Sequence, residues 1–179
     1  MSPDDFIGKI APLVQKHAPR YGVKVCSPII AQAILESGWG ESTLGSKYHN
    51  YFGMKCGTRW TGASVNMSTK EEYTPGVMTT IQDNFRVYAT MEDGIAGYFE
   101  FLFVGMSRYD NLKTATTPEQ YMQLIKADGY ATASSYVDSC LKLISQYNLK
   151  QFDQAQAGEV QAMSLSKIET AILWMEKTA

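Results

Sequence analysis

The sequence lacks the cysteine and histidine patterns of a disulfide-bonded, zinc-binding or cofactor-dependent protein. Its three cysteines, Cys26, Cys56 and Cys140, are odd in number and form no CxxC motif or Cys/His cluster, which argues against a disulfide scaffold and a zinc site. No P-loop, GxGxxG motif or metal-binding His/Asp cluster is present, so we expect no metal and no cofactor. Free cysteines of this kind are typical of synthesis in a reducing compartment.

Export and membrane signals are missing as well. The N-terminus has no basic region followed by an apolar stretch, and no run of about 18 apolar residues occurs anywhere. The net charge of −2 and the isoelectric point near 5.7 give no electrostatic reason to expect nucleic acid as a partner. We therefore expect a protein made in the cytoplasm without a signal peptide, with no membrane insertion, and monomeric as this fragment.

The chain does contain enough apolar and aromatic material for one folded domain. Its 179 residues are 45% hydrophobic and include 11 Tyr, 7 Phe and 3 Trp. Helical patterns lie on either side of a strand-like region that begins near Ala63 and contains the turn signal Thr74–Gly76. This order predicts an α+β, mainly α domain over residues 1–150, with a helical lobe and a small β-hairpin lobe flanking a substrate cleft. A linker over 151–159 and a C-terminal helix over 160–179 are expected to follow.

Start signals are clear for several of these helices. Ser2, Thr90 and Thr117 each precede a helical pattern in the manner of an N-cap, and Asp93 lies three residues after Thr90, the spacing of a capping box. The stretch over residues 45–62, rich in glycine and aromatic residues, is expected to be a loop.

The stretch over residues 27–40 organises the chain. Ser27 is a suitable N-cap, Pro28 suits the first helical position, and the glycines that follow Glu36 can end the helix in the left-handed conformation. Apolar residues occupy most of its circumference, as in a core helix. Because the helix dipole and apolar neighbours disfavour an ionised carboxyl there, the pKa of Glu36 is expected to be raised, as a general acid requires. A solvated Glu36, or one paired with a cation such as Lys47, is the alternative.

Carboxylates in two separate places are compatible with hydrolysis of a glycosidic bond. That reaction needs an acid to protonate the leaving oxygen and a second group that stabilises the oxocarbenium-like centre or activates the attacking water. Glu36 lies at a helix end, whereas Glu71 and Glu72 lie in the strand-like region, where a solvated strand edge is the alternative. A cysteine nucleophile is a poorer hypothesis, since neither His17 nor His49 lies in a recognisable cysteine-protease context.

Aromatic residues cluster in the expected cleft walls, where they could pack on the C–H faces of sugar rings. The candidates are Trp39, Tyr48, Tyr51, Phe52, Trp60 and Tyr130. Tyr51 and Trp60 are expected to be exposed, because their neighbours place them in loops. Core packing is the alternative for the whole group and the preferred interpretation for Phe52.

Motifs spread over about residues 3 to 150 carry a family resemblance. They are Ala31–Ser42, Asn50–Lys55, Thr69–Tyr73, Phe85–Tyr88, Asp93–Ile95, Gly129–Thr132, Tyr136 and Tyr147–Leu149. In this order they resemble the bacterial and phage β-N-acetylglucosaminidases of glycoside hydrolase family seventy-three. The resemblance implies a lysozyme-like fold and a peptidoglycan hydrolase that cleaves the β-1,4 bond between N-acetylglucosamine and N-acetylmuramic acid.

The resemblance also implies roles for individual residues. Glu36 matches the general acid, and Glu72 best matches the second carboxylate, with Glu71 as runner-up because the local alignment could slip by one. Tyr130 matches a functionally important tyrosine, although the family often continues with Asp-Pro where this chain has Ala133 and Ser134. The residues expected to bind substrate are Trp39, Tyr51, Trp60, Glu71 and Tyr136.

Two mechanisms and two other functions remain open on the sequence. The substrate's own N-acetyl group could act as nucleophile with Tyr130 and Glu72 assisting, or Glu72 could activate a water. Muramidases and lytic transglycosylases share the fold and the dominant Glu, and a non-catalytic cell-wall glycan-binding module is the alternative of another class. The missing signal peptide suits a phage endolysin, a secreted autolysin being the other possibility, and Ile168–Trp174 resembles the lead-in to a second lytic domain.

Overall fold

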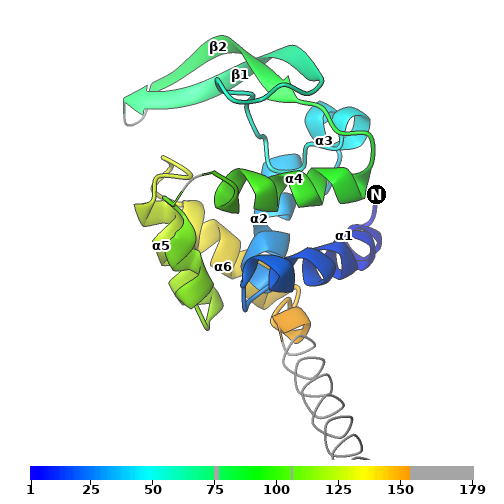
Figure 1. Cartoon of the computed structure of the whole chain (residues 1–179), viewed down its shortest axis with the longest axis vertical. Helices are drawn as coiled ribbons and strands as arrows, with labels where there is room; N and C mark the ends of the chain where they lie inside the picture. The colour runs from blue at the N-terminus through cyan, green and yellow to red at the C-terminus, as the bar shows by residue number, and fades with distance from the viewer. Residues whose placement is uncertain (75–76, 106, 154–179) are drawn as a thin grey trace, which may run out of the picture.

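The computed structural model of the chain describes residues 1–74, 77–105 and 107–153, and their side chains except those of residues 70–74, 77 and 78. The helices are α1 (Pro3–His17), α2 (Ser27–Ser37), α3 (Thr43–Tyr48), α4 (Met91–Phe103), α5 (Pro118–Ala127) and α6 (Tyr136–Gln146), with short 3₁₀ turns at Ala18–Tyr21 and Asp110–Thr114. Two strands, β1 (Ser64–Thr74) and β2 (Val77–Arg86), form a hairpin that projects from the helical body (Figure 1). The predicted α+β, mainly α class is confirmed.

Helix α2 lies at the centre of the helical body and packs against α1, α5 and α6 (Figure 1). Every one of its residues is buried except Leu35 and Glu36, so the prediction of a core helix is confirmed. The helix ends at Ser37, just after Glu36 as predicted, and Gly38 follows with φ +54°, the left-handed conformation that glycine adopts readily. An apolar helix thus passes through the core and exposes a carboxylate at its last turn.

The start of α2 differs from the prediction. Cys26 occupies the N-cap position and Ser27 is the first helical residue. The Ser27 hydroxyl donates a hydrogen bond to the carboxylate of Asp153 instead of capping its own helix. Residues 151–153 are helical and contact the body through Asp153, so the first part of the expected linker packs on the domain, while the rest of it and the expected helix over 160–179 lie outside the described residues.

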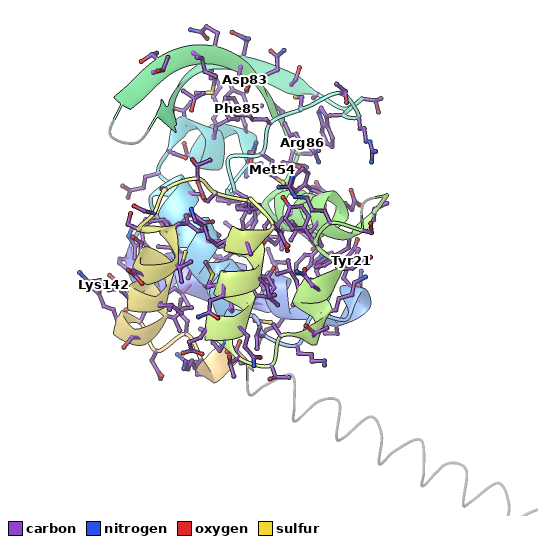
Figure 2. All side chains as sticks on the ribbon, turned by 90° about the vertical axis from the view of Figure 1, so that its left-hand side faces the viewer. Tyr21, Met54, Asp83, Phe85, Arg86 and Lys142 are labelled. Carbon is purple, nitrogen blue, oxygen red and sulfur yellow. The ribbon has the colours of Figure 1, made fainter. Side chains whose placement is uncertain are left out.

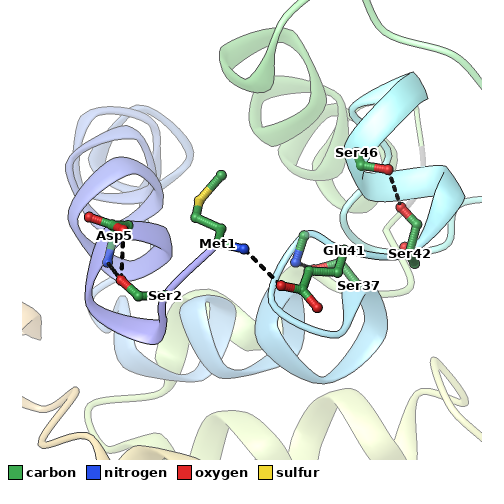
Figure 3. A network of polar contacts seen from close by, with 8 residues as sticks. Met1, Ser2, Asp5, Ser37, Glu41, Ser42 and Ser46 are labelled. Carbon is green, nitrogen blue, oxygen red and sulfur yellow. Dashed lines mark hydrogen bonds and ion pairs between the residues drawn. The ribbon is translucent and has the colours of Figure 1, made fainter.

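The other predicted N-caps are confirmed. Ser2, Thr90 and Thr117 each accept a hydrogen bond from the backbone N–H three residues later. Figure 3 shows the Ser2 cap of α1, together with the N-terminal amino group of Met1, which lies 2.7 Å from Oε1 of Glu41. The expected loop over 45–62 is shorter than predicted, because α3 occupies its first residues after a cap by Ser42.

The hairpin is antiparallel and joins the body at its base. Its register pairs Ser64 with Arg86 and Glu72 with Met78, with an irregularity between positions 72 and 74. At the base, the N–H of Arg86 donates to the carbonyl of Met54, and both residues lie between the hairpin and the helices in Figure 2. Two strands are described, so the predicted β-hairpin is confirmed. No helix within the described ranges is long and apolar enough to cross a membrane.

Candidate active site

A cleft of about 1100 Å³ separates the hairpin from the helical body. It runs past the end of α2, along the loop that follows α3, under the hairpin and beside the segment between α5 and α6. Its lining consists of Leu35, Glu36, Leu44, Phe52–Trp60, Met67–Thr69, Phe85, Arg86, Glu100, Phe101, Val104, Arg108, Tyr109, Gly129–Ala133 and Tyr136. The open shape and mixed polar and apolar lining suit a long polar polymer better than a small enclosed ligand.

Glu36 brings a carboxylate to the floor of this cleft. It is exposed, in contrast to the residues before it in α2, because the helix leaves the core at its last turn. The carboxylate lies beside Gly53 of the opposite loop, where an added Cβ would come within 3.8 Å of Oε2 of Glu36. That distance is an ordinary van der Waals contact, and what favours glycine at position 53 is its φ of +62°, in the left-handed region.

Asn50 holds that loop in place. Its side-chain amide donates to the carbonyls of Met54 and Arg86, both at 2.9 Å, and its Oδ1 accepts from the N–H of Met54 at 2.8 Å. The residue is 1% exposed, so the amide is fully used inside the protein. Asn50 therefore couples the cleft loop to the end of β2, a structural role that the sequence motif alone did not reveal.

Two tyrosines form the wall next to Glu36, Tyr130 in the segment after α5 and Tyr136 at the start of α6. Tyr130 is partly buried, and its hydroxyl is 3.5 Å from the carbonyl of Phe52 across the cleft loop. Tyr136 is buried, and its hydroxyl accepts a hydrogen bond from Gln32 of α2 at 2.9 Å. Burial raises the pKa of both phenols well above the usual value, and the nearby charge of Glu36 adds to the increase. Both therefore act as neutral hydrogen-bonding groups near pH 7.

The hairpin side of the cleft carries an aromatic and cationic cluster. The guanidinium carbon of Arg86 lies 4.7 Å from the ring centre of Trp60 and 5.1 Å from that of Phe101, and its Nε donates to the carbonyl of Lys55. Trp60 is partly buried and lines the cleft, where it offers a ring face at a protein wall. Trp60 was among the predicted site residues and Arg86 was not, because the contacts of Arg86 come from two separate segments, the loop that carries Lys55 and Trp60 and helix α4.

Other predicted aromatic residues do not line the cleft. Tyr51 was expected to be exposed and is 4% exposed, so that expectation was wrong. Its ring packs on Phe6 of α1 with ring centres 5.9 Å apart. Trp39 packs edge-on against Tyr147 at 4.7 Å and against Phe6 at 6.2 Å, and it is not among the residues that line the cleft. Both rings stabilise the junction between α1 and the turn after α2.

Phe52 and Tyr48 differ in their placement. Phe52 is 3% exposed and stacks on Tyr98 with ring centres 4.0 Å apart, so the preferred core interpretation is confirmed, although one edge of the residue lines the cleft. Tyr48 ends α3, lies under the Nζ of Lys47 at 5.3 Å, and is not among the cleft residues. The predicted set of sugar-packing rings is thus reduced to Trp60 and Tyr130, and Tyr136, which was predicted separately to bind substrate, also lines the cleft.

The positions of Glu71 and Glu72 on the hairpin follow from the backbone pairing of β1 with β2. Glu71 pairs with Thr79 and Glu72 with Met78, both near the turn end of β1. Residues Met67–Thr69 of the same strand line the cleft, so β1 passes along it immediately before these positions. Successive strand positions belong to opposite faces of a hairpin. The choice between Glu71 and Glu72 therefore stays a prediction.

Charge in the cleft is predominantly positive in a chain whose net charge is −2. Among the described lining residues, the cations are Lys55, Arg59, Arg86 and Arg108, whereas the carboxylates are Glu36 and Glu100. Part of this charge is neutralised by Asp83, which lies 3.0 Å from Lys55. Within the described ranges, no group of three His, Cys, Asp or Glu residues could hold a metal ion.

Comparisons with known proteins agree with this geometry. A family model named Glucosaminidase, described as mannosyl-glycoprotein endo-beta-N-acetylglucosaminidase, matches residues 11–149. The peptidoglycan hydrolase FlgJ of Pseudomonas aeruginosa is 39% identical over 150 residues, covering 81% of this chain and 37% of that protein. The exo-glucosaminidase LytG of Bacillus subtilis is 33% identical over 129 residues, covering 70% of this chain and 45% of that protein. The chain therefore spans less than half the length of either curated relative.

A solved structure has the same fold. The crystal structure of a peptidoglycan hydrolase mutant from Sphingomonas sp. A1 superposes with a TM-score of 0.72 at 30% sequence identity. The match covers 83% of this chain and 96% of that one. The expected lysozyme-like arrangement of a helical body and a hairpin lobe is confirmed by this likeness.

Proposed function

Because the chain belongs to the glucosaminidase family, we propose that it hydrolyses the glycan strands of peptidoglycan at the β-1,4 bond that follows N-acetylglucosamine. The observation that carries the proposal is the exposed carboxylate of Glu36 at the end of a buried helix, on the floor of a long open cleft. A carboxyl group in this position can reach a bound polymer, while the rigid helix fixes its direction.

In the proposed reaction, Glu36 donates its proton to the glycosidic oxygen as the bond from that oxygen to the anomeric carbon breaks. The acetamido oxygen of the same N-acetylglucosamine then bonds to the anomeric carbon and forms a cyclic oxazoline intermediate. Water opens this ring at the anomeric carbon and returns a proton to Glu36. Tyr130 and Glu72 assist as hydrogen-bonding groups, and the product keeps the β configuration.

The competing route uses Glu72 as a base that activates water for direct displacement, which inverts the anomeric carbon. Proton NMR of the freshly released product distinguishes the two. An initial β anomer supports the substrate-assisted route, and an initial α anomer rejects it in favour of inversion.

The cleft walls suit this substrate in two ways. Trp60, held by Arg86, provides an aromatic face on which the C–H face of a sugar ring can pack. The positive lining attracts the carboxylates of the peptide and lactyl groups that peptidoglycan carries, which favours a peptidoglycan strand over a neutral glycan.

Product analysis on purified peptidoglycan tests the proposal. The released fragments are reduced with borohydride and analysed by mass spectrometry, with the Glu36→Gln protein as control. Reduced N-acetylglucosamine ends from the wild type alone support it. Reduced muramic acid ends would assign a muramidase and anhydro-muramic ends a lytic transglycosylase. Binding to the wall without any fragment would assign a non-catalytic binding module.

We also infer that the chain acts as a monomer on the bacterial cell wall, because a polymer must lie along an open cleft. Light scattering coupled to size-exclusion chromatography checks this. A mass near 19.9 kDa is expected, and a stable dimer would contradict it.

A further inference from the structure

We propose that Gln32 is a positioning residue that holds the phenol of Tyr136 as a hydrogen-bond donor to the reacting groups beside Glu36. The inference rests on the proposed function and extends it to a residue that does not reach the cleft. Gln32 lies on α2 four residues before Glu36, so the two side chains share one face of the helix.

A chain of four buried polar side chains leads from the core to the cleft. The hydroxyls of Tyr121 and Tyr98 are 3.1 Å apart, the Tyr98 hydroxyl donates to Oε1 of Gln32 at 2.7 Å, and Nε2 of Gln32 donates to the Tyr136 hydroxyl at 2.9 Å. Tyr98, Tyr121 and Gln32 are 0% exposed, and Tyr136 is 5% exposed. Each group comes from a different helix, since α4, α5, α2 and α6 contribute one apiece.

Burial decides the direction in which this chain of hydrogen bonds runs. If Tyr121 donates to Tyr98, then Tyr98 donates to Gln32 and the amide donates to Tyr136, so every buried proton has an acceptor. In the reverse direction, Tyr136 donates to the Gln32 amide, the amide donates to Tyr98 and Tyr98 donates to Tyr121. The Tyr121 proton is then left buried with no acceptor among the contacts of the described residues. An unpaired buried donor costs its full desolvation free energy, so the first direction is favoured.

This direction determines what Tyr136 can do. Because its oxygen already accepts from Gln32, its own proton is free to point away from the amide and into the cleft that the residue lines. A fixed donor at that place can stabilise negative charge on Glu36 after proton transfer, or on the acetamido oxygen of the substrate. Gln32 thus pre-orders a donor that would otherwise turn inward toward the core.

Five variants test the proposal, with kcat and KM measured on soluble peptidoglycan fragments. Gln32→Met removes the amide at similar volume, and Tyr136→Phe removes the donor. Each is expected to lower kcat by about 10- to 100-fold with little change in KM. A loss of this size is the effect expected when one hydrogen bond to a charged group is removed from the transition state. The double variant is expected to lose no more than the larger single loss, because both remove the same donor.

Gln32→Glu supplies a rescue that a purely structural role would not show. A protonated carboxyl at position 32 accepts from Tyr98 and donates to Tyr136 as the amide does, whereas an ionised one accepts from both. The titratable groups in contact with it are Tyr98 and Tyr136, with Tyr121, Tyr130, Cys26, Cys140 and Glu36 close by, and none is a cation. Burial among these acids keeps the new carboxyl protonated to a higher pH than usual. Activity near that of the wild type at low pH, with an extra loss as pH rises, is expected.

Tyr121→Phe is the matched control. It removes a buried hydroxyl from the same chain, but Tyr98 then still needs Gln32 as its acceptor, so the direction is kept. We expect lower thermal stability with unchanged kcat. Full kcat in Gln32→Met, multiplied losses in the double variant, or a wild-type pH profile in Gln32→Glu would each overturn the inference. A wild-type chain that releases no product overturns the proposed function and this inference together, whereas equal product release by wild type and Gln32→Met overturns the inference alone.

Discussion

The carboxylate of Asp153 binds Ser27, the first residue of the helix that carries Glu36, across 126 positions of the sequence. Its Oδ2 accepts from the Ser27 hydroxyl at 2.7 Å, and its Oδ1 accepts from the backbone N–H groups of Cys26 and Ser27 at 2.6 and 2.7 Å. Free N–H groups and the positive end of the helix dipole favour an anion at this place. Asp153 thus caps the N-terminus of α2, although it lies four positions beyond residue 149, where the family match ends.

Replacing Asp153 with Ala should destabilise the fold. The change leaves two backbone N–H groups and one hydroxyl without their acceptor, and a lost helix cap typically costs about 1–2 kcal/mol. We expect a decrease of about 2 kcal/mol in the free energy of unfolding, measured by urea denaturation. Asp138→Ala, which replaces an exposed acid in the first turn of α6, should change it by less than about 0.5 kcal/mol. Equal effects of the two variants would show that Asp153 is not a cap.

Replacing Glu36 with Gln should abolish lysis without unfolding the protein. The amide keeps the size of the side chain but cannot donate a proton to the leaving oxygen, so a loss of about 10²- to 10⁴-fold in kcat is expected. Turbidity clearing of purified cell walls measures it. Glu100→Gln is the matched control, because Glu100 is the other described carboxylate in the cleft lining and comes from α4 rather than from α2. A comparable loss in both would contradict a unique acid at Glu36.

Replacing Glu72 and Glu71 in turn should identify the second carboxylate. The two positions belong to opposite faces of the hairpin, so one substitution is expected to matter much more than the other. We expect Glu72→Gln to lower kcat at least about tenfold and Glu71→Gln to change it little. Steady-state kinetics on soluble glycan fragments gives both numbers. The reverse order would assign the role to Glu71.

The three cysteines should react with alkylating reagents in a fixed order. Burial raises the pKa of the Cys26 and Cys140 thiols to about 12, with the charges of Asp153 and Glu36 adding to the effect. Since thiolate is the reactive form, only about one in ten thousand of these thiols is ionised at pH 8, and the fraction rises with pH. Cys56 is partly exposed in the cleft lining, so it should be labelled first despite a raised pKa.

Peptide mass spectrometry after iodoacetamide treatment of the folded protein locates the label. Labelling of Cys56 should also slow hydrolysis, because the adduct occupies the cleft. The Cys56→Ser protein serves as control and should remain unlabelled and active after the same treatment. Early labelling of Cys140 would contradict the burial of that thiol.

Two glycines in helices should respond in opposite directions to substitution by alanine. A Cβ on Gly94 of α4 would collide with the backbone oxygen of His49, which cannot move without shifting the cleft loop. We expect Gly94→Ala to lower the free energy of unfolding by more than about 2 kcal/mol, as overpacking against backbone does. Gly8 of α1 has open space around it and should gain about 0.5–1 kcal/mol as Ala. Thermal unfolding of both variants checks the pair.

Local patterns predicted much of the architecture. The caps at Ser2, Thr90 and Thr117, the apolar course of α2 and the strands of the hairpin were all recognisable, because each depends on residues within a few positions of one another. The expected exposure of Tyr51 was wrong because its burial depends on a residue far from it in the sequence. Loop neighbours suggested a free ring, but Phe6 of a different helix covers it.

The sequence by itself determined the helix that carries Glu36, its glycine end and the carboxylate on its last turn, since helix propensity, apolar periodicity and a left-handed stop are local properties. Only the tertiary structure decided which groups surround that carboxylate. Asp153 caps the start of α2, Gln32 hydrogen-bonds tyrosines from two other helices, and Arg86 packs on Trp60 at the cleft. These contacts join residues far apart in the chain, where distance and burial, rather than sequence spacing, determine which polar groups become partners.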